Sequence, residues 1–434
     1  MRGWGVRKFT MRAFVACGFA SCFLVACASD RLGLGADEAL SSESPSGQTR
    51  KAATPRAHHT PDGFKNNYIG AVEKPFLDLL RWKWDAFWDD LPRAPKTPTP
   101  TQTPDLALIH ANAKAGKAMQ PLVTWIGHAS TLVQASGLNV LTDPIFSERA
   151  SPVQLLGPKR QQPPGVALKD LPPIDVVVIS HNHYDHLDRQ SVFDLDQRAK
   201  AVDPAGHGRT LFLVPLGLKA WLADLGISNV VELDWWDKHT VKGPHGGQAD
   251  FYLTPVQHWS ARGLNDRSKT LWGGWSVMGE DFRWYFSGDT GYSKDFADTK
   301  AFFDAKLPAV TGPATSANAM ATGTPNANNA IADKAEKSGG DTVFDLALLA
   351  VGAYEPRWFM AAQHINPHEA AQIHKDLGAA KSIGIHWGTF NLTDEALDRP
   401  LLDLTAAKRA LGLADDAFFV LKIGQSRRFE RRKR

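Results

Sequence analysis

The chain has 434 residues, of which 43% are hydrophobic, with 49 Lys and Arg against 46 Asp and Glu. This composition excludes a disordered or fibrous protein, and the length suits one large globular domain with appendages or two smaller domains. The balance of charge gives no reason to expect a nucleic-acid partner.

The first residues predict an exported protein. Several basic residues between Arg2 and Arg12 precede an apolar stretch over residues 13–26, the order found in signal peptides. The stretch is too short to span a bilayer, which takes about 20 apolar residues. It ends in Leu24-Val25-Ala26-Cys27, which resembles a bacterial lipobox, so we expect a signal peptide over residues 1–26 and a lipid anchor on Cys27. An uncleaved anchor and a conventional signal peptide are the alternatives.

The cysteines all lie in this segment, at Cys17, Cys22 and Cys27. The mature domain can therefore form no internal disulfide and offers no thiolate, so its chemistry must come from His, carboxylates and hydroxyls. Ala28 rather than Asp follows Cys27. By analogy with bacterial lipoproteins, this implies attachment to the periplasmic face of the outer membrane.

The region before residue 121 is expected to be a tether and an extension. Residues 27–62 are rich in Ser, Gly, Ala and Pro, which predicts a flexible tether. In the extension over residues 63–120, apolar residues recur at helical spacing from Pro75 to Leu91, which predicts an amphipathic helix. We expect this helix to cover the core of the main domain; insertion of its tryptophans into a membrane interface is the alternative. A Thr/Pro stretch over residues 95–104 reads as a spacer.

Residues 121–426 show the alternation of short apolar runs and polar loops typical of a mixed α/β domain. A helix is expected from Asn366 to Leu377, with Gly378 at its end. Residues 308–341 interrupt the pattern and predict an exposed insertion. The basic run over residues 427–434 predicts a solvated tail, with contact to anionic lipid as the alternative. Strands are expected at 122–126, 132–134, 140–142, 175–180, 211–214, 251–254, 283–287, 344–351, 382–385 and 418–422.

The strongest local signal is His181-Asn182-His183-Tyr184-Asp185-His186, directly after the apolar run 175–180. Four side chains of metal-ligand type on one short loop can point at two centres, because neighbouring side chains diverge. Satisfied polar side chains in a loop are the alternative.

Further candidate ligands follow other predicted strands. His258 comes after residues 251–254, Asp289 after 283–287, and His386 directly after 382–385. Each alone is more often an ordinary polar residue. Together they fit the rule that functional groups in α/β proteins gather beyond the carboxyl ends of strands, so the sequence predicts one binuclear site with seven ligands.

The sequence resembles the metallo-β-lactamase superfamily and, within it, the N-acyl-phosphatidylethanolamine-hydrolysing phospholipases D. The resemblance covers about residues 122–424, with 308–341 as the main departure, and implies an αββα sandwich of two mixed sheets with flanking helices. The matching blocks are Thr124 to Ala129, Leu141 to Phe146, Gly157 to Arg160, His181 to His186, Glu232 to Trp236, Ser287 to Tyr292, Gly352 to Met360 and Ile385 to Phe390.

The resemblance also implies roles for the candidate ligands. Imidazole and carboxylate ligands suit zinc best among divalent metals, with iron or manganese as alternatives. Asp185 would be both a ligand and a group that orients the nucleophile. The implied arrangement has His181, His183 and His258 on one metal, Asp185, His186 and His386 on the other, and Asp289 between them.

Other residues are placed around this centre. Asp143 follows a predicted strand and is expected to fix a ligand imidazole. Gln363 and His364, together with Tyr184, are implied to surround the phosphate headgroup; a hydrogen bond at the helix start is the alternative for His364. His374 lies within the predicted helix and is assigned to packing or the surface.

The first hypothesis for function is hydrolysis of a phosphodiester in an N-acylated phosphatidylethanolamine, at a membrane surface reached through the lipid anchor. The second keeps the metals but cleaves a lactone or a carboxylic ester. The third is a non-enzymatic metal-binding envelope lipoprotein. The family resemblance also implies a homodimer.

Overall fold

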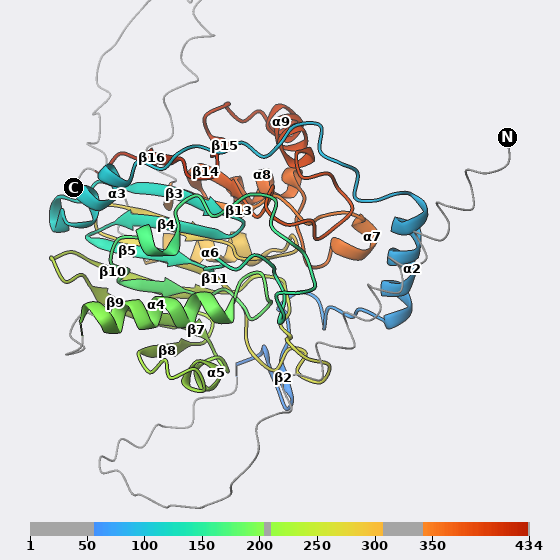
Figure 1. Ribbon diagram of the computed structural model, residues 1–434, viewed down its shortest axis with the longest axis horizontal. Coiled ribbons are helices and arrows are strands. Elements are labelled where there is room, and N and C mark those ends of the chain that lie inside the picture. The colour runs from blue at the N-terminus through green and yellow to red at the C-terminus, as the bar shows by residue number, and fades with distance from the viewer. Residues whose placement is uncertain (1–55, 204–209, 307–341, 433–434) are drawn as a thin grey trace, which may run out of the picture.

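The computed structural model describes residues 56–203, 210–306 and 342–432 (Figure 1). The expected signal peptide over 1–26, the lipidation site Cys27 and the insertion over 308–341 lie outside these residues. Within the described part of the chain, no helix combines the length and the apolar character needed to cross a membrane.

Two seven-stranded mixed sheets form the centre of the fold. Each contains three antiparallel and three parallel pairings. The first has the order β16 (Ser426–Arg428), β3 (Leu122–Gly127), β4 (Ser130–Ala135), β5 (Leu138–Thr142), β6 (Val176–Val178), β7 (Leu211–Pro215) and β8 (Val230–Leu233). The second has the order β15 (Phe418–Val420), β14 (Ala379–Ile385), β13 (Phe344–Ala350), β12 (Arg283–Phe286), β11 (Gly274–Gly279), β10 (Gln248–Thr254) and β9 (Lys238–Lys242).

Helices flank the sheets, which confirms the αββα sandwich. The first sheet packs against α3 (Leu106–Ala113), α4 (Arg189–Val202) and α5 (Lys219–Ala223). The second packs against α6 (Asp295–Asp304), α8 (Pro367–Asp376) and α9 (Arg399–Leu411). The remaining elements are β1 (His59–Thr60), β2 (Gly63–Phe64), α2 (Phe76–Trp88), α7 (Arg357–Met360) and two short 3-10 turns, Gly116–Ala118 and Leu168–Asp170.

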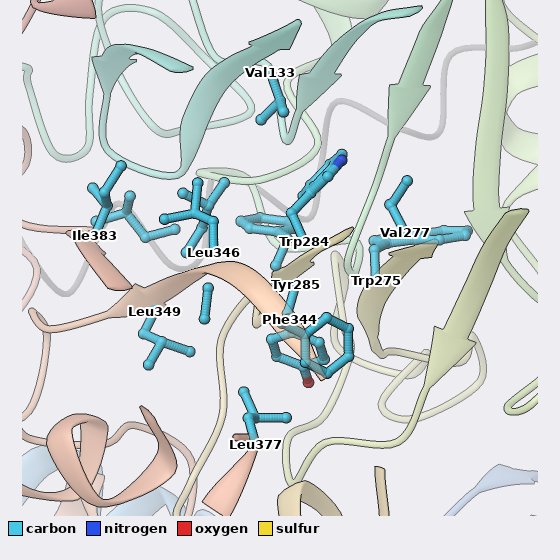
Figure 2. Packing of buried hydrophobic residues seen from close by; sticks show 14 of the residues in the cluster. Val133, Trp275, Val277, Trp284, Tyr285, Phe344, Leu346, Leu349, Leu377 and Ile383 are labelled. Carbon is cyan, nitrogen blue, oxygen red and sulfur yellow. The ribbon is translucent and has the colours of Figure 1, made fainter. Parts of the chain in front are cut away.

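Large apolar side chains fill the space between the sheets. Figure 2 shows Trp284 and Leu346 of the second sheet on the side that faces Val133 of β4, and Leu349 near Leu377 on the opposite side. β13 therefore buries both of its faces, which explains its continuous apolar run. Burial of one such side chain contributes about 1.5–3 kcal/mol to the free energy of folding. The strands are therefore firmly held, and the loops at their ends start from fixed positions.

All ten strands expected from the sequence are present, although their ends shift by a few residues. Four strands of the two large sheets were missed: β8, β9, β11 and β16. β9 alternates exposed and half-buried residues at the edge of its sheet, and β11 begins and ends with glycine. Neither pattern carries the buried apolar run that identified the other strands.

α8 begins where the sequence predicts. The Asn366 side chain accepts a hydrogen bond from the Glu369 backbone N–H at 2.8 Å, and the Glu369 carboxylate accepts one from the Asn366 N–H at 2.9 Å. This reciprocal pair satisfies two N–H groups that the helix itself leaves unpaired. Gly378, with φ +61°, follows the last turn in a conformation that glycine adopts without strain.

The amphipathic helix α2 is confirmed, but it does not cover the main core. Trp82 is buried against Phe359 and Met360 of α7 in a small separate cluster, and its Nε1–H donates to Asp394 at 2.9 Å. Figure 1 shows α2 at the edge of the molecule beside α7. Five other large apolar side chains of α2 are exposed: Phe76, Leu77, Leu80, Trp84 and Trp88.

The basic run at the C-terminus is not a solvated tail as far as residue 432. Residues 426–428 form β16 and pair with β3, and Arg432 forms an ion pair with Asp345 at 2.8 Å. The edge of β3 would otherwise expose unpaired backbone groups, and β16 covers them. The expected domain boundary at residue 426 is therefore too early.

The N-terminal segments also pack on the domain. His58 and His59 lie 2.7 and 2.8 Å from the two carboxylate oxygens of Asp234, so the expected flexible tether over 27–62 ends before these residues. Thr99, within the expected spacer, donates to the carbonyl of Gly388 at 2.7 Å. The composition of the tether predicts flexibility and that of the Thr/Pro stretch predicts a spacer, but these tertiary contacts hold parts of both segments against the domain.

His374 gives a test of the packing of α8. Its Nδ1 lies 2.8 Å from Ser382 Oγ, and burial lowers its pKa from 6.5 to about 4. The neutral form is favoured in the folded state, so this contribution to stability is complete above pH 6.5 and is lost as the pH falls toward 4. From about pH 7.5 to pH 5, the wild type should lose about 2 kcal/mol more unfolding free energy than His374→Gln in urea titrations. A difference that does not change with pH would contradict this.

Candidate metal centre

The seven predicted ligands come together where strands of both sheets end. The loop after β6 carries His181, His183, Asp185 and His186, and His386 follows β14 directly. His258 and Asp289 lie in the loops after β10 and β12. Together with His128, these residues form two groups, each with ligand atoms close enough to share one ion: His181, His183, His258 and Asp289 in the first, and His128, Asp185, His186 and His386 in the second.

In the first group, two imidazoles face the Nδ1 atom of His183. His181 Nε2 lies 2.8 Å and His258 Nε2 lies 3.3 Å from this atom. Asp289 Oδ2 lies 3.9 Å from His181 Nε2 and 4.0 Å from His258 Nε2. Three neutral nitrogens and one carboxylate oxygen make a set that zinc binds readily.

In the second group, the spacing is close to that of a tetrahedral site. His186 Nε2 and His386 Nε2 are 3.1 Å apart, and each is 3.4 Å from Asp185 Oδ2. Asp289 completes the set, with Oδ2 at 3.1 Å from His186 and Oδ1 at 3.1 Å from His386. Bonds of 2.0–2.1 Å in a tetrahedron place ligand atoms about 3.3 Å apart, so these residues fit a metal ion. Asp289, a member of the first group, thus also contacts two residues of the second.

A buried oxygen of Asp289 gives a second indication of a cation. Asp289 is 3% exposed, and its Oδ1 accepts no hydrogen bond from any described residue. His386 Nε2 lies 3.1 Å from this oxygen but does not make a hydrogen bond to it, so the buried oxygen keeps part of its desolvation cost. An ion between the two groups would remove that cost.

The ligand imidazoles are held in orientation by partners on their other nitrogen. His186 Nδ1 lies 2.6 Å from Asp143 Oδ2, so Asp143 lies where the sequence predicts, in contact with a ligand imidazole. His258 Nδ1–H donates to the carbonyl of Gln363 at 2.9 Å, and His181 Nδ1 lies 2.9 Å from Ser180 Oγ. Such partners fix the ring and leave the opposite nitrogen as the ligand atom.

The charges of the site are those of a cation-binding cavity. Burial lowers the pKa of His183 and of His258 to about 3, so both rings are neutral, as ligands must be. Burial also opposes protonation of His386, but Asp289 and Asp185 outweigh it and raise its pKa to about 9. Burial raises the pKa of the Asp289 carboxyl, and the charge on His186 more than reverses that effect and holds it well below its usual range.

His128 is a site residue that sequence reasoning missed. Its Nε2 lies 2.9 Å from Asp185 Oδ2, and its ring centroid is 3.9 Å from that of His386. Burial lowers its pKa to about 3, so a neutral ring meets the Asp185 carboxylate. The signal was present, since His128 lies in the quoted block Thr124 to Ala129 and directly follows β3.

Asn66 is a second missed residue, and it comes from the N-terminal extension. Its side chain accepts a hydrogen bond from the His258 N–H at 2.9 Å and donates to the His258 carbonyl at 3.0 Å. One buried amide thus fixes both backbone groups of a ligand. No local sequence pattern predicts a contact between residues so far apart in the sequence.

The three expected headgroup residues occupy different positions. His364 Nδ1 lies 3.7 Å from Asp289 Oδ2 and is buried without a hydrogen-bond partner among the described residues. Since Asn366 caps α8, the helix-start role for His364 is wrong. The side-chain oxygen of Gln363 accepts a hydrogen bond from the Trp259 Nε1–H at 2.7 Å. The Tyr184 hydroxyl donates to the Arg262 carbonyl at 2.8 Å. Of the three, only His364 faces the centre directly.

Comparison with known proteins gives two kinds of match. A family model described as "Beta-lactamase superfamily domain" matches residues 138–305 and 314–387, a little over half of the chain. The chain is 38% identical over 312 residues to "N-acyl-phosphatidylethanolamine-hydrolyzing phospholipase D 1" of Caenorhabditis elegans, covering 70% of this chain and 74% of that protein.

Two further relatives span much of the chain. A mitochondrial protein of Saccharomyces cerevisiae that carries the same phospholipase name is 31% identical over 345 residues, covering 78% of this chain and 62% of that protein. An uncharacterized protein of Mycobacterium tuberculosis is 36% identical over 318 residues, covering 72% and 69% of the two chains.

The pair of hydrogen bonds from Asn66 predicts a loss in Asn66→Ala. Without them, the His258 backbone is unpaired and its ring is less well placed, so affinity for metal should fall about tenfold to 100-fold, measured by competition with a chromophoric chelator. Asn67→Ala is the matched control, because exposed Asn67 donates to Asp295 of α6 at 2.8 Å and not to a ligand. Equal affinities in the two variants would show that Asn66 does not position His258.

Proposed function

The chain belongs to the metallo-β-lactamase superfamily, in the group of N-acyl-phosphatidylethanolamine-hydrolysing phospholipases D, and from this premise we propose that it cleaves the phosphodiester of an N-acylated phosphatidylethanolamine. The superfamily makes it a metal-dependent hydrolase. The observation that carries the finer proposal is the 38% identity, over most of both chains, to a relative named for this reaction. The products would be phosphatidic acid and an N-acylethanolamine.

The proposed cofactor is a pair of divalent ions, with zinc best matched to the donors. When bound, the pair supplies an activated water near neutral pH and positive charge for the phosphoryl oxygens. One ion would be held by His181, His183 and His258, the other by Asp185, His186 and His386, with Asp289 shared between them.

The chain's own residues define the rest of the mechanism. Asp185 is held by His128 through Oδ2 and would orient the attacking water toward phosphorus. The bond from phosphorus to the ethanolamine oxygen then breaks, and that oxygen takes up a proton. That proton is the one released by the attacking water. His364 lies beside this step, with its Nδ1 near Asp289 and without a hydrogen-bond partner in the described residues. Burial lowers its pKa to about 3, so the ring is neutral and would donate a hydrogen bond to the leaving oxygen rather than supply a proton of its own.

A lipid substrate fits the surface of the protein. The exposed side chains of α2, which include Phe76, Leu77, Trp84 and Trp88, form an apolar face suited to the boundary between lipid headgroups and acyl chains. We include in the proposal an anchor on Cys27 and a location on the periplasmic face of the outer membrane. Both would keep the protein next to its substrate.

The first test removes one ligand at a time. Asp289→Asn and His258→Ala should each lose bound metal and at least about 100-fold of the hydrolysis of bis(p-nitrophenyl) phosphate. Metal analysis and circular dichroism report metal content and folding, and exposed His368→Ala is the control.

Lipid mass spectrometry on the wild type should detect N-acylethanolamine and phosphatidic acid. Turnover of a lactone or carboxylic ester in place of both phosphodiesters would favour the second hypothesis.

The second test concerns α2. Trp84→Ala/Trp88→Ala should lower hydrolysis of substrate in vesicles about tenfold or more, since each tryptophan contributes on the order of 1.5–3 kcal/mol on burial. Hydrolysis of soluble bis(p-nitrophenyl) phosphate should stay unchanged. Phe193→Ala, which removes an exposed aromatic from α4, is the control. Equal losses on both substrates would contradict a membrane role for α2.

A further inference from the structure

The side chain of Arg262 makes an unusual set of contacts beside the metal centre. Its Nη1 donates to the backbone carbonyls of Asn182 and Leu187, both at 2.8 Å. The guanidinium carbon also lies 4.1 Å from the ring centroid of Tyr184 and 4.8 Å from that of Trp221. A guanidinium can make all of these contacts at once, because it is planar and charged and can stack on aromatic rings.

The two carbonyls bracket the ligand loop. Between Asn182 and Leu187 lie His183, Asp185 and His186, and His181 directly precedes them. The loop has few backbone bonds of its own in the described structure, with His186 N–H and Leu187 N–H both donating to the carbonyl of His183. The Arg262 side chain therefore fixes the distance between the two ends of the loop.

Arg262 itself lies on a second ligand loop, four residues after His258. Its carbonyl accepts the Tyr184 hydroxyl at 2.8 Å, and its N–H donates to Asp266 Oδ2 at 2.9 Å. The loop after β6 and the loop after β10 are thus joined in both directions. Together these two loops carry five of the seven ligands.

We propose that Arg262 is a positioning residue that holds the loops after β6 and β10 in register and so sets the geometry of both metal sites. It touches neither an ion nor the substrate in this role. The inference rests on the proposed metal centre but is independent of the proposed lipid substrate. Lysine keeps the positive charge, yet a single ammonium cannot bond both carbonyls and stack on both rings as the guanidinium does.

The test compares Arg262→Lys with a matched arginine at the opposite end of β6. Arg198 of α4 also bonds two backbone carbonyls, those of Leu171 and Pro172, which precede β6. Arg198→Lys therefore loses the same kind of hydrogen bonds to backbone carbonyls, but away from the metal centre. Affinity for Zn²⁺ is measured by chelator competition, and the absorption spectrum of the Co²⁺-loaded proteins reports ligand geometry.

Arg262→Lys should weaken metal binding about tenfold to 100-fold and alter the Co²⁺ spectrum, whereas Arg198→Lys should do neither. At saturating metal, Arg262→Lys should lower kcat for bis(p-nitrophenyl) phosphate and leave KM nearly unchanged. Hydrogen exchange should be faster at residues 182–187 in Arg262→Lys alone.

Two results would overturn the proposal. Metal affinity and Co²⁺ spectrum equal to those of the wild type would show that Arg262 does not position the ligands. A raised KM with normal metal binding would make Arg262 a substrate contact instead. If the wild-type protein itself takes up no metal, the metal centre and this inference fall together, whereas failure to cleave the lipid alone would leave the inference standing.

Discussion

The structure depends on a concentration of buried carboxylates and imidazoles at one edge of two sheets. Asp143, Asp289 and His186 are all 3% exposed or less, and the His186 ring contacts both carboxylates. Buried charges of this kind are costly unless an opposite charge or a hydrogen bond compensates each one. In the protein alone, protons on His186 and His386 provide part of that compensation, since the carboxylates raise the pKa of both rings. Divalent ions would displace these protons, so metal binding and proton release are coupled.

Holding such a cluster requires backbone that ordinary residues avoid. His128, Asp143, Ala353 and His386 all have positive φ, between +31° and +66°, in a region where side chains other than glycine are strained. His128 and His386 are also bonded to each other, with the His386 N–H donating to the His128 carbonyl. The buried sheets beneath these residues supply the folding free energy that offsets the cost of the strained backbone.

Much of the metal centre and of the fold could be predicted, because local sequence patterns indicate it. The His181 to His186 loop and the single ligands His258, Asp289 and His386 each follow an apolar run, and the chemistry of their side chains identifies them. The cap of α8 was equally local, since Asn366 and Glu369 lie in one turn. Strands without a buried apolar run, such as β9 and β16, were not found, because their positions come from pairing with a neighbour rather than from their own side chains.

The residues that orient the ligands could not be read in the same way. Asn66 meets His258 across 192 positions of sequence, and Arg262 reaches Asn182 across 80. Such contacts exist only once the sheets have brought distant loops together. The headgroup candidates show the same limit. The side chains of Gln363 and Tyr184 bond Trp259 and the Arg262 carbonyl, which the sequence did not indicate, and their contact with a headgroup stays a prediction.

The N-terminal segment links helix α2 to the metal centre. Three side chains, Arg56, His58 and His59, converge on Asp234, and Asn66 then fixes the backbone of His258. The same segment continues into α2, whose exposed aromatic face begins at Phe76. The tether and extension expected from composition therefore supply both a support for a ligand and the exposed aromatic face for which we propose a membrane role. Because Asn66 of this segment bonds both backbone groups of His258, the position of the segment from Arg56 to Phe76 bears on the geometry of the metal centre.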